Sequence, residues 1–399
     1  MPSDSVDVAI LGAGIAGCSL SYHLARRGVG PVLVFDPQTL AAGASGRAAG
    51  IVTEQLWNRW DVEVTRAAKA EYAELARRWD PSAYATNGFA RWTRQAEAVA
   101  VLDRVVPQFR TWGVPIERLD ADALSRRVPW GRFDDVRGAI WSPDDGVVAP
   151  STMTEIYAKR AQADGVEYWM GDPFHALDRA GDGWSISGRG RTVRARRVVL
   201  AAGAWTKRLL TRLGLPAPLA PYRVQAALLR PPRPDPRLFP SVHDIDTDVY
   251  ARPEANGRIL AGDGTELNEI DPETFRPGGD ESFVAHLAES FQTRFPGWAD
   301  AELIRAWAGV VVSTPDRRAL VGPVSAAPGL YLMTGFNGFG VMRAGGVAQR
   351  LADAMSVGEA TAAATEPLAP VLPDRFAGGF APFSPRPGFT LEGGSDPRF

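Results

Sequence analysis

The first forty residues carry the pattern that most limits how this chain can fold. An apolar run from Val6 to Leu11 is followed by the glycine motif Gly12-Ala13-Gly14-Ile15-Ala16-Gly17, and a second apolar run, 32–35, ends in Asp36. A strand, a G-x-G-x-x-G turn, a helix and a second strand that ends in an acid form, in this order, a dinucleotide-binding βαβ unit.

Each glycine of this motif has its own physical task. Gly12 allows the tight turn, Gly14 lets the backbone approach a pyrophosphate, and Gly17 lets the helix lie close to the first strand. The free N–H groups and the positive dipole end of the helix then face the phosphates. Asp36 accepts hydrogen bonds from a ribose, so this segment predicts a bound adenine dinucleotide.

Composition and charge exclude several classes of protein. The 399 residues are 45% hydrophobic, an ordinary value for a globular protein, and the length predicts two domains. A net charge of −2 without basic runs argues against nucleic acid or an anionic membrane as partner. Cys18 is the single cysteine, and neither it nor His23 has a metal-ligand partner at useful spacing, so no metal is predicted. With no signal-peptide pattern and no long apolar stretch, we expect a cytoplasmic protein without membrane insertion.

The rest of the chain alternates between helical patterns and short strands. Apolar residues at helical spacing predict helices over 63–79, 151–164, 282–291 and 341–355. Alternation predicts a hairpin over 184–195, and the apolar run 197–200 predicts a buried strand of the nucleotide-binding domain. Residues 216–305 carry proline clusters and alternating strands, which indicate a mainly antiparallel sheet. Residues 361–399 are rich in proline and glycine and are expected to form a surface-draped or disordered tail.

Four blocks in this order resemble the flavin-dependent amine and amino-acid oxidoreductases typified by D-amino acid oxidase, glycine oxidase and monomeric sarcosine oxidase. They are the βαβ start, the loop 43–50 of the form G-A-S-G-R-x-x-G, the strand 197–205 that ends in A-A-G-A-W, and a C-terminal signature. That signature comprises Trp307-Ala308-Gly309, Thr314-Pro315-Asp316, Gly322-Pro323 and Gly335-Phe336-Asn337-Gly338-Phe339-Gly340-Val341-Met342. The resemblance implies an α/β Rossmann-like FAD-binding domain with a mainly antiparallel, α+β substrate domain.

The resemblance also assigns domains and cofactor residues. It implies a discontinuous FAD-binding domain over 1–90, 145–215 and 306–360, a substrate domain over 91–144 and 216–305, and the tail 361–399. Besides the first motif and Asp36, the expected FAD-binding residues are Ser45, Gly46, Arg47, Ala49, Gly50, Phe174, Ala202, Gly203, Gly335, Asn337, Gly338, Phe339, Gly340, Val341 and Met342. Three closely spaced glycines before the helix 341–355 expose its N-terminus, which in this family lies near the pyrimidine end of the flavin.

Departures from the family pattern are informative. Several members attach FAD through a cysteine before the T-P-D motif, where this chain has Gly309, so FAD is expected to be non-covalent. Sarcosine-oxidase-like members activate oxygen with a lysine on a substrate-domain strand, whereas the matching strand 258–262 has none. Glycine-oxidase-like members hold the substrate carboxylate with an arginine in the stretch that is Val310-Val311-Val312 here.

Three residues are the best candidates for the substrate pocket. Tyr250 and Arg252 alternate with apolar neighbours and share a sheet face, and Arg252 is able to hold a carboxylate bidentately. The alternative is an exposed arginine on a solvated strand. Trp307 is either a wall of the pocket or a core residue. No catalytic residue is assigned. His243 lies in a predicted loop and is either a catalytic residue or a surface histidine.

The resulting hypothesis is an FAD-dependent oxidoreductase that oxidises the C–N bond of an amine or amino acid by hydride transfer to the flavin, giving an imine. Its partners would be the small-molecule substrate and oxygen or another electron acceptor. Two alternatives remain at this point: an NAD(P)H-dependent flavin hydroxylase, disfavoured by the C-terminal signature, and a non-catalytic FAD-binding subunit.

Overall fold

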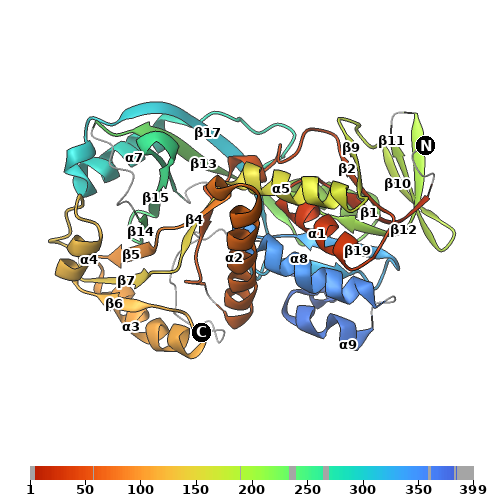
Figure 1. Cartoon of the computed structure of the whole chain (residues 1–399), viewed down its shortest axis with the longest axis horizontal. Coiled ribbons are helices and arrows are strands. Elements are labelled where there is room, and N and C mark those ends of the chain that lie inside the picture. Colours follow the sequence, from red (N-terminus) through yellow and green to blue (C-terminus); the bar gives the residue numbers. More distant parts are fainter. Residues whose placement is uncertain are drawn as a thin grey trace.

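Two large sheets joined by long strands form the framework of the protein. The computed structural model describes residues 5–56, 58–188, 190–232, 240–263, 269–357, 361–381 and 383. Within these residues each sheet has eight strands, and a small sheet of three strands lies beside them. In Figure 1 the first sheet occupies one end of the molecule and the second sheet the other, and β13 (Ala220–Arg230) and β17 (Glu302–Ser313) reach from the second sheet toward the first.

In the first sheet the pairings between strands that have helices between them along the chain are parallel, whereas those between strands joined by a short connection are antiparallel. Its strand order is β10-β11-β12-β1-β2-β9, and β19 pairs with the end of β12 and with β18. The strand bounds are β1 (Ser5–Leu11), β2 (Val32–Asp36), β9 (Glu167–Met170), β10 (Ala176–Ala180), β11 (Gly183–Gly188), β12 (Arg191–Leu200), β18 (Leu320–Pro323) and β19 (Leu330–Thr334). The predicted hairpin is confirmed as β11 and β12, and β12 continues as the predicted buried strand beside β1.

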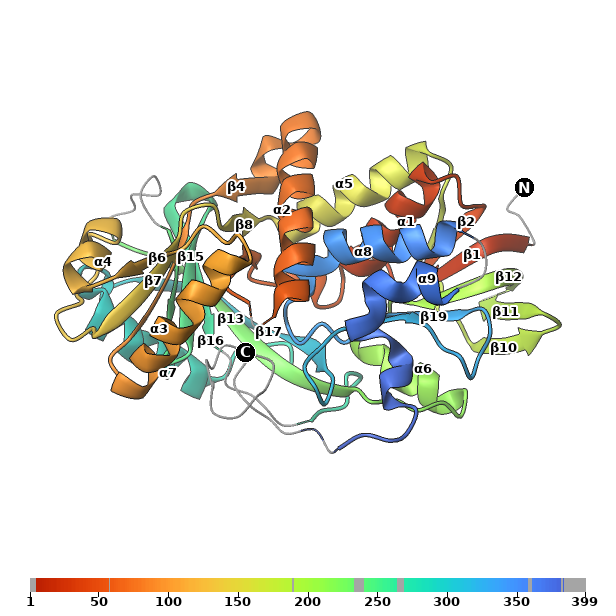
Figure 2. The same ribbon diagram turned by 90° about the horizontal axis from the view of Figure 1, so that it is seen from below.

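Both faces of the parallel strands β1 and β2 are buried, as expected for a parallel sheet. Val8 and Ile10 of β1 face one apolar cluster, whereas Ala9 and Leu11 face another. The first cluster is covered by α1 (Ile15–Arg26), α2 (Arg59–Trp79), α5 (Pro150–Ala163) and α8 (Gly340–Ser356), with α1 packed between α5 and α8 (Figure 2). The second cluster includes residues of α6 (Thr206–Arg212).

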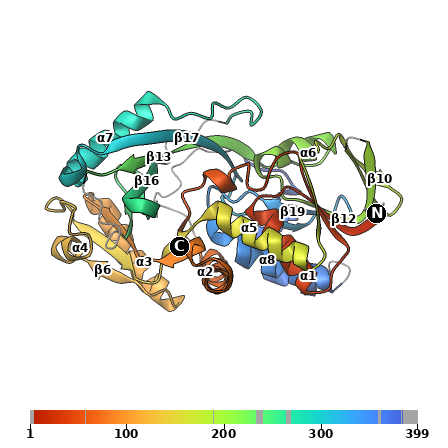
Figure 3. The ribbon, with the colours of Figure 1, turned by 45° about the horizontal axis from the view of Figure 1, so that its top comes forward.

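The second sheet is mainly antiparallel, in the order β17-β13-β16-β15-β14-β5-β7-β6. Its strands are β5 (Phe89–Thr93), β6 (Glu117–Leu119), β7 (Gly138–Ser142), β13 (Ala220–Arg230), β14 (Ser241–Asp244), β15 (Val249–Glu254), β16 (Arg258–Asp263) and β17 (Glu302–Ser313). One face of this sheet packs against α7 (Glu281–Arg294), as Figure 3 shows. Phe283 and Leu287 of α7 belong to the same apolar cluster as Ala227 and Ala261 of the sheet. The remaining elements are α3 (Ala96–Thr111), α4 (Ala121–Arg127), α9 (Ala362–Thr365), and the small sheet of β3 (Ile51–Val52), β4 (Tyr84–Thr86) and β8 (Gly146–Val148).

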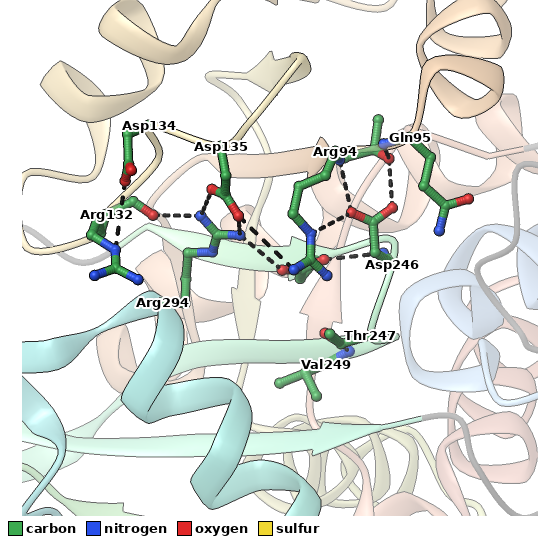
Figure 4. Close-up of polar contacts among 11 residues, drawn as sticks. Arg94, Gln95, Arg132, Asp134, Asp135, Asp246, Thr247, Val249 and Arg294 are labelled. Atoms are coloured by element: carbon green, nitrogen blue, oxygen red, sulfur yellow. Dashed lines mark hydrogen bonds and ion pairs between the residues drawn. The ribbon is translucent and has the colours of Figure 1, made fainter.

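A network of charged side chains ties the outer parts of the second sheet together (Figure 4). Arg294, buried at the end of α7, pairs with Asp135 at 2.7 Å and with Asp244 of β14 at 3.6 Å. Arg94 pairs with Asp246 at 3.0 Å. Burial alone would raise the pKa of Asp135, but the hydrogen bond and charge of Arg294 outweigh it and lower this pKa. The network thus joins α7 to β14 and to the segment that precedes β7.

The expected fold class is confirmed: a Rossmann-like α/β part accompanies a mainly antiparallel sheet. The domain boundaries stay a prediction, although the pairing of β17 with β13 places 306–313 in the second sheet and not in the first. The tail differs from expectation in its first part. Short helical turns over 362–376 bury Leu368 and Val371 against the core that contains α8, because their apolar side chains find a partner there; residues 384–399 lie outside the described part.

Candidate active site

A cavity of about 630 Å³ lies where the two sheets meet. It extends from the N-terminus of α1, past the loop 42–51, to β13 and β15 of the second sheet, and the loop 335–342 closes another side. Its size is within the range of small-molecule and cofactor pockets. The cavity therefore joins the predicted nucleotide site to the predicted substrate sheet.

The glycine motif has the geometry that its spacing predicts. A Cβ on Gly12, whose φ is +119°, would lie 2.4 Å from the carbonyl oxygen of Ala201, and one on Gly17 would lie 1.9 Å from that of Gly12. α1 can approach β1 this closely only because both positions are glycine. Gly14 is the N-cap and has no side-chain cap, and the first turn holds no acidic residue. The positive end of α1 thus faces the cavity with no acidic residue in its own first turn.

Asp36 and Ser45 complete this end of the cavity. The carboxylate of Asp36 accepts hydrogen bonds from the amides of Ala13 at 2.7 Å and Gln38 at 2.8 Å. Burial nevertheless raises its pKa above the ordinary value. The hydroxyl oxygen of Ser45 accepts from the amide of Ile15 at 2.9 Å, so the loop after β2 is joined directly to the start of α1.

Hydrogen bonds and an ion pair made by the side chains of Asn337 and Arg343 hold the loop 335–342 in place. Gly335 and Gly338 have φ values of +73° and +83°, and Asn337 has +54°, so the turn uses left-handed backbone that glycine adopts at least cost. The side chain of Asn337 accepts from the amide of Thr314 at 3.1 Å and donates to the carbonyl of Gly335 at 3.0 Å. Buried Arg343 pairs with Asp61 of α2 and donates to the carbonyl of Phe336. These contacts aim the N-terminus of α8 at the cavity.

The substrate end of the cavity is bordered by tyrosines of the second sheet. Tyr250 and Tyr222 both line it, and burial raises the pKa of both phenols above 10, so each is protonated at neutral pH. Tyr250 lies across Gly262, where a Cβ would come within 2.2 Å of its hydroxyl. The glycine therefore makes room for the phenol on this sheet face.

Most of the sequence-predicted cofactor residues line this cavity. Five predicted site residues do not: Ala13, Gly17, Gly46, Arg252 and Trp307. The first three act through their backbone. Gly46 packs against the carbonyl oxygen of Ala41, as Gly17 does against that of Gly12, and the amide of Ala13 donates a hydrogen bond to Asp36. Whether each lining residue binds FAD stays a prediction.

Arg252 and Trp307 were expected in the substrate pocket, and the structure turns both toward the loop 43–50 instead. Arg252 is 5% exposed and bonds the carbonyl of Ala49, and Trp307 bonds that of Arg47. The reason is tertiary: this loop lies against the sheet face that was assigned to substrate. Arg252 is therefore not an exposed arginine either.

His243 lies in β14 and not in a loop, and it does not line the cavity. It is fully buried and its Nε2 pairs with Asp248 at 2.9 Å; burial lowers its pKa despite that carboxylate. It therefore belongs to the interior of the second sheet. Lining residues that the sequence reasoning missed include Gln38, Trp205, Tyr222 and Gln225. Only Trp205, inside the A-A-G-A-W run, carried a local signal.

Two negative findings apply to the described residues. None of the helices there has both the length and the apolar character needed to cross a bilayer. Nor does that part of the chain hold three or more His, Cys, Asp or Glu side chains grouped as a metal site. Cys18 is buried in α1, and burial raises the pKa of its thiol to about 12.

Comparison with known families, sequences and structures shows what this chain is similar to. The model of the DAO family, described as FAD dependent oxidoreductase, matches residues 7–354. The chain is 30% identical over 363 residues to 4-methylaminobutanoate oxidase (formaldehyde-forming) of Paenarthrobacter nicotinovorans, covering 87% of this chain and 43% of that protein. It is 25% identical over 344 residues to glycine oxidase of Geobacillus kaustophilus, covering 84% and 89%. The structure of L-proline dehydrogenase from P. horikoshii superposes with a TM-score of 0.85 at 21% identity, covering 96% of this chain and 100% of that one.

Proposed function

Because the chain belongs to the DAO family of FAD-dependent oxidoreductases, we propose that it oxidises the carbon–nitrogen bond of an amine or amino acid. The observation that carries the proposal is the cavity that joins a dinucleotide-binding helix N-terminus to a tyrosine-bordered sheet face. The names of the two sequence relatives, an oxidase of a methylated amine and an oxidase of glycine, support this reaction class. The chain spans 43% of the length of the first of these, so the substrate is itself part of the proposal.

The residues present fit FAD. The N-terminus of α1 would hold the pyrophosphate, Asp36 a ribose, and the loops 43–50 and 335–342 the isoalloxazine ring. When bound, this ring accepts a hydride from the carbon beside nitrogen, and the substrate leaves as an imine. The chain itself would supply the dry, oriented pocket: Tyr222 and Tyr250 are protonated phenols that can donate hydrogen bonds to the substrate.

The acceptor and the compartment belong to the same proposal. Oxygen or another acceptor would take the electrons from the reduced cofactor. A single buried cysteine supports a reducing compartment such as the cytoplasm.

Anaerobic titration of the yellow protein tests the reaction class. 4-Methylaminobutanoate, glycine and proline are added in turn, and the visible flavin band is followed; at least one secondary or primary amine should bleach it. FAD alone in buffer is the control. If dithionite bleaches the band while no amine in a broad panel does so, the proposal is wrong, and a non-catalytic FAD-binding subunit is the better description. Bleaching by NAD(P)H alone would favour a hydroxylase.

A further inference from the structure

Two side chains of the second sheet hold carbonyls of the same cofactor loop. Trp307 of β17 donates its Nε1–H to the carbonyl of Arg47 at 3.1 Å, and Arg252 of β15 donates its Nε–H to the carbonyl of Ala49. The strand register places both on one face of the sheet: Trp307 lies opposite Ala226, Ala226 opposite Gly262 and Gly262 opposite Tyr250, and Arg252 is two residues further along.

The sheet also approaches the loop closely at this place. A Cβ on Gly309, two residues after Trp307 on the same face, would lie 3.2 Å from the Cβ of Arg47. Arg47 in turn directs its guanidinium to the carbonyls of Ala42 and Gly43, within its own loop. The loop is therefore braced both by its own arginine and by the sheet.

Arg252 is a stiff donor. It is 5% exposed, its Nη1 donates to the carbonyl of Pro253 at 2.7 Å, and its Nη2 pairs with Glu254 at 2.8 Å. A buried guanidinium is stable only when its donors are satisfied, so these contacts fix where its Nε–H points. Trp307 is covered by the guanidinium of Arg305, 4.7 Å above its ring.

Because the peptide group is planar, the orientation of the Ala49 carbonyl also fixes the direction of the Gly50 N–H. In a trans peptide the N–H of one residue points opposite to the C=O of the residue before it. The carbonyl of Ala49 points to Arg252, which does not line the cavity, whereas Ala48, Ala49 and Gly50 do. The N–H of Gly50 is thereby turned to the cavity side. Only glycine fits here, since its φ is +75° and a Cβ would lie 2.2 Å from the carbonyl oxygen of Val148.

We infer that Arg252 and Trp307 are positioning residues: they orient the peptides of residues 47–50 so that the backbone amide of Gly50 hydrogen-bonds the flavin ring. The inference rests on the proposed function only in placing the ring at the end of the cavity that the second sheet borders. It replaces the role of carboxylate receptor for Arg252, and it makes the second sheet a part of the cofactor site.

Three substitutions test the inference in the holoprotein. Arg252→Met removes the buried donor, and Trp307→Phe removes one N–H while keeping most of the ring. Arg305→Met is the matched control, because this arginine of the same sheet touches the Trp307 ring but does not bond the loop. The FAD dissociation constant is measured from the fluorescence of FAD released on dilution, and the reduction potential by equilibration with a reference dye.

The expected FAD dissociation constants rise about 10- to 100-fold in Arg252→Met and about 2- to 10-fold in Trp307→Phe, the factors that correspond to a charged and a neutral hydrogen bond. The reduction potential shifts to lower values in both variants, because an N–H donor stabilises the electron-rich reduced ring and its loss removes that stabilisation. In Arg305→Met the FAD dissociation constant stays within twofold of the wild-type value and the reduction potential is unshifted. Arg252→Lys, which restores a cationic donor, should recover part of the loss.

A purely structural role would lower thermal stability and leave the potential and the FAD constant of Trp307→Phe at wild-type values, and that result would overturn the inference. Both readouts use chemical reduction. They therefore remain interpretable even if no amine reduces the wild-type protein, which is the outcome that contradicts the proposed function instead.

Discussion

Replacing Gly17 or Gly14 by alanine should separate two tasks that a single motif performs. The Cβ of Gly17→Ala would stand 1.9 Å from the carbonyl oxygen of Gly12, a backbone atom that cannot rotate away, so α1 must move until the distance is at least 3.0 Å. Overpacking of this kind costs about 1–3 kcal/mol, and the better helix propensity of alanine returns at most about 1 kcal/mol. Because the contact is with backbone at 1.9 Å, we take the upper end of the first range, and subtracting the second leaves a net loss of about 2 kcal/mol in the stability of the apoprotein.

Gly14→Ala should behave in the opposite way. Residue 14 has extended backbone, with φ −78° and ψ −178°, which any residue adopts, and its new Cβ would meet only the hydroxyl of Ser45, at 3.0 Å. The stability of the apoprotein should change by less than about 0.5 kcal/mol. The methyl group nevertheless occupies the place where the backbone must approach a pyrophosphate, so FAD affinity should fall by at least about tenfold, and Gly14→Val should abolish binding.

Urea denaturation of the apoproteins, followed by tryptophan fluorescence, measures the first quantity, and quenching of FAD fluorescence measures the second. The wild-type apoprotein is the common reference. The reasoning is refuted if Gly17→Ala is as stable as the wild type, or if Gly14→Ala binds FAD with wild-type affinity.

Three further predictions concern attachment, oxygen and pH. Acid precipitation should leave FAD in a yellow supernatant, because the only cysteine, Cys18, is buried in α1; a pellet that keeps its colour would contradict this. Air should reoxidise the reduced protein more slowly than it does lysine-bearing relatives of the sarcosine-oxidase type, because Lys69, Lys159 and Lys207 all pair with carboxylates and none lines the cavity. Stopped-flow mixing with oxygenated buffer checks it, and equal rates would count against it. Burial alone would raise the pKa of Asp316, but Arg375 at 2.8 Å lowers it, so this pair stabilises the fold above the unfolded-state pKa of about 3.9 and is lost as pH falls through the lower folded pKa. Arg375→Gln should cost about 1 kcal/mol at pH 7 and flatten the acid limb of the stability curve, and an unchanged limb would argue against the pair.

The prediction that this chain binds FAD depends on features that are local in the sequence. Gly12, Gly14 and Gly17 are recognisable because the turn, the cap and the close helix contact all arise within one βαβ unit, where spacing along the chain sets spacing in space. The same holds for Gly335 and Gly338, because left-handed backbone is a local property that closely spaced glycines indicate. Most residues chosen on these grounds line the cavity.

Only the tertiary structure decided which segments the side chains of the second sheet contact. Alternation correctly put Tyr250 and Arg252 on one face, but it carries no information about which distant segment covers that face. The covering segment is a loop some two hundred positions earlier in the chain, and so Arg252 bonds Ala49 while Tyr250, two residues away, lines the cavity. Leu368 likewise sits in a stretch without periodicity and is nevertheless buried, because the core that contains α8 offers it an apolar partner. Local backbone conformation follows from the residues that are adjacent in the sequence. Which distant surfaces come into contact is decided by tertiary packing, and it is therefore known only from the folded structure.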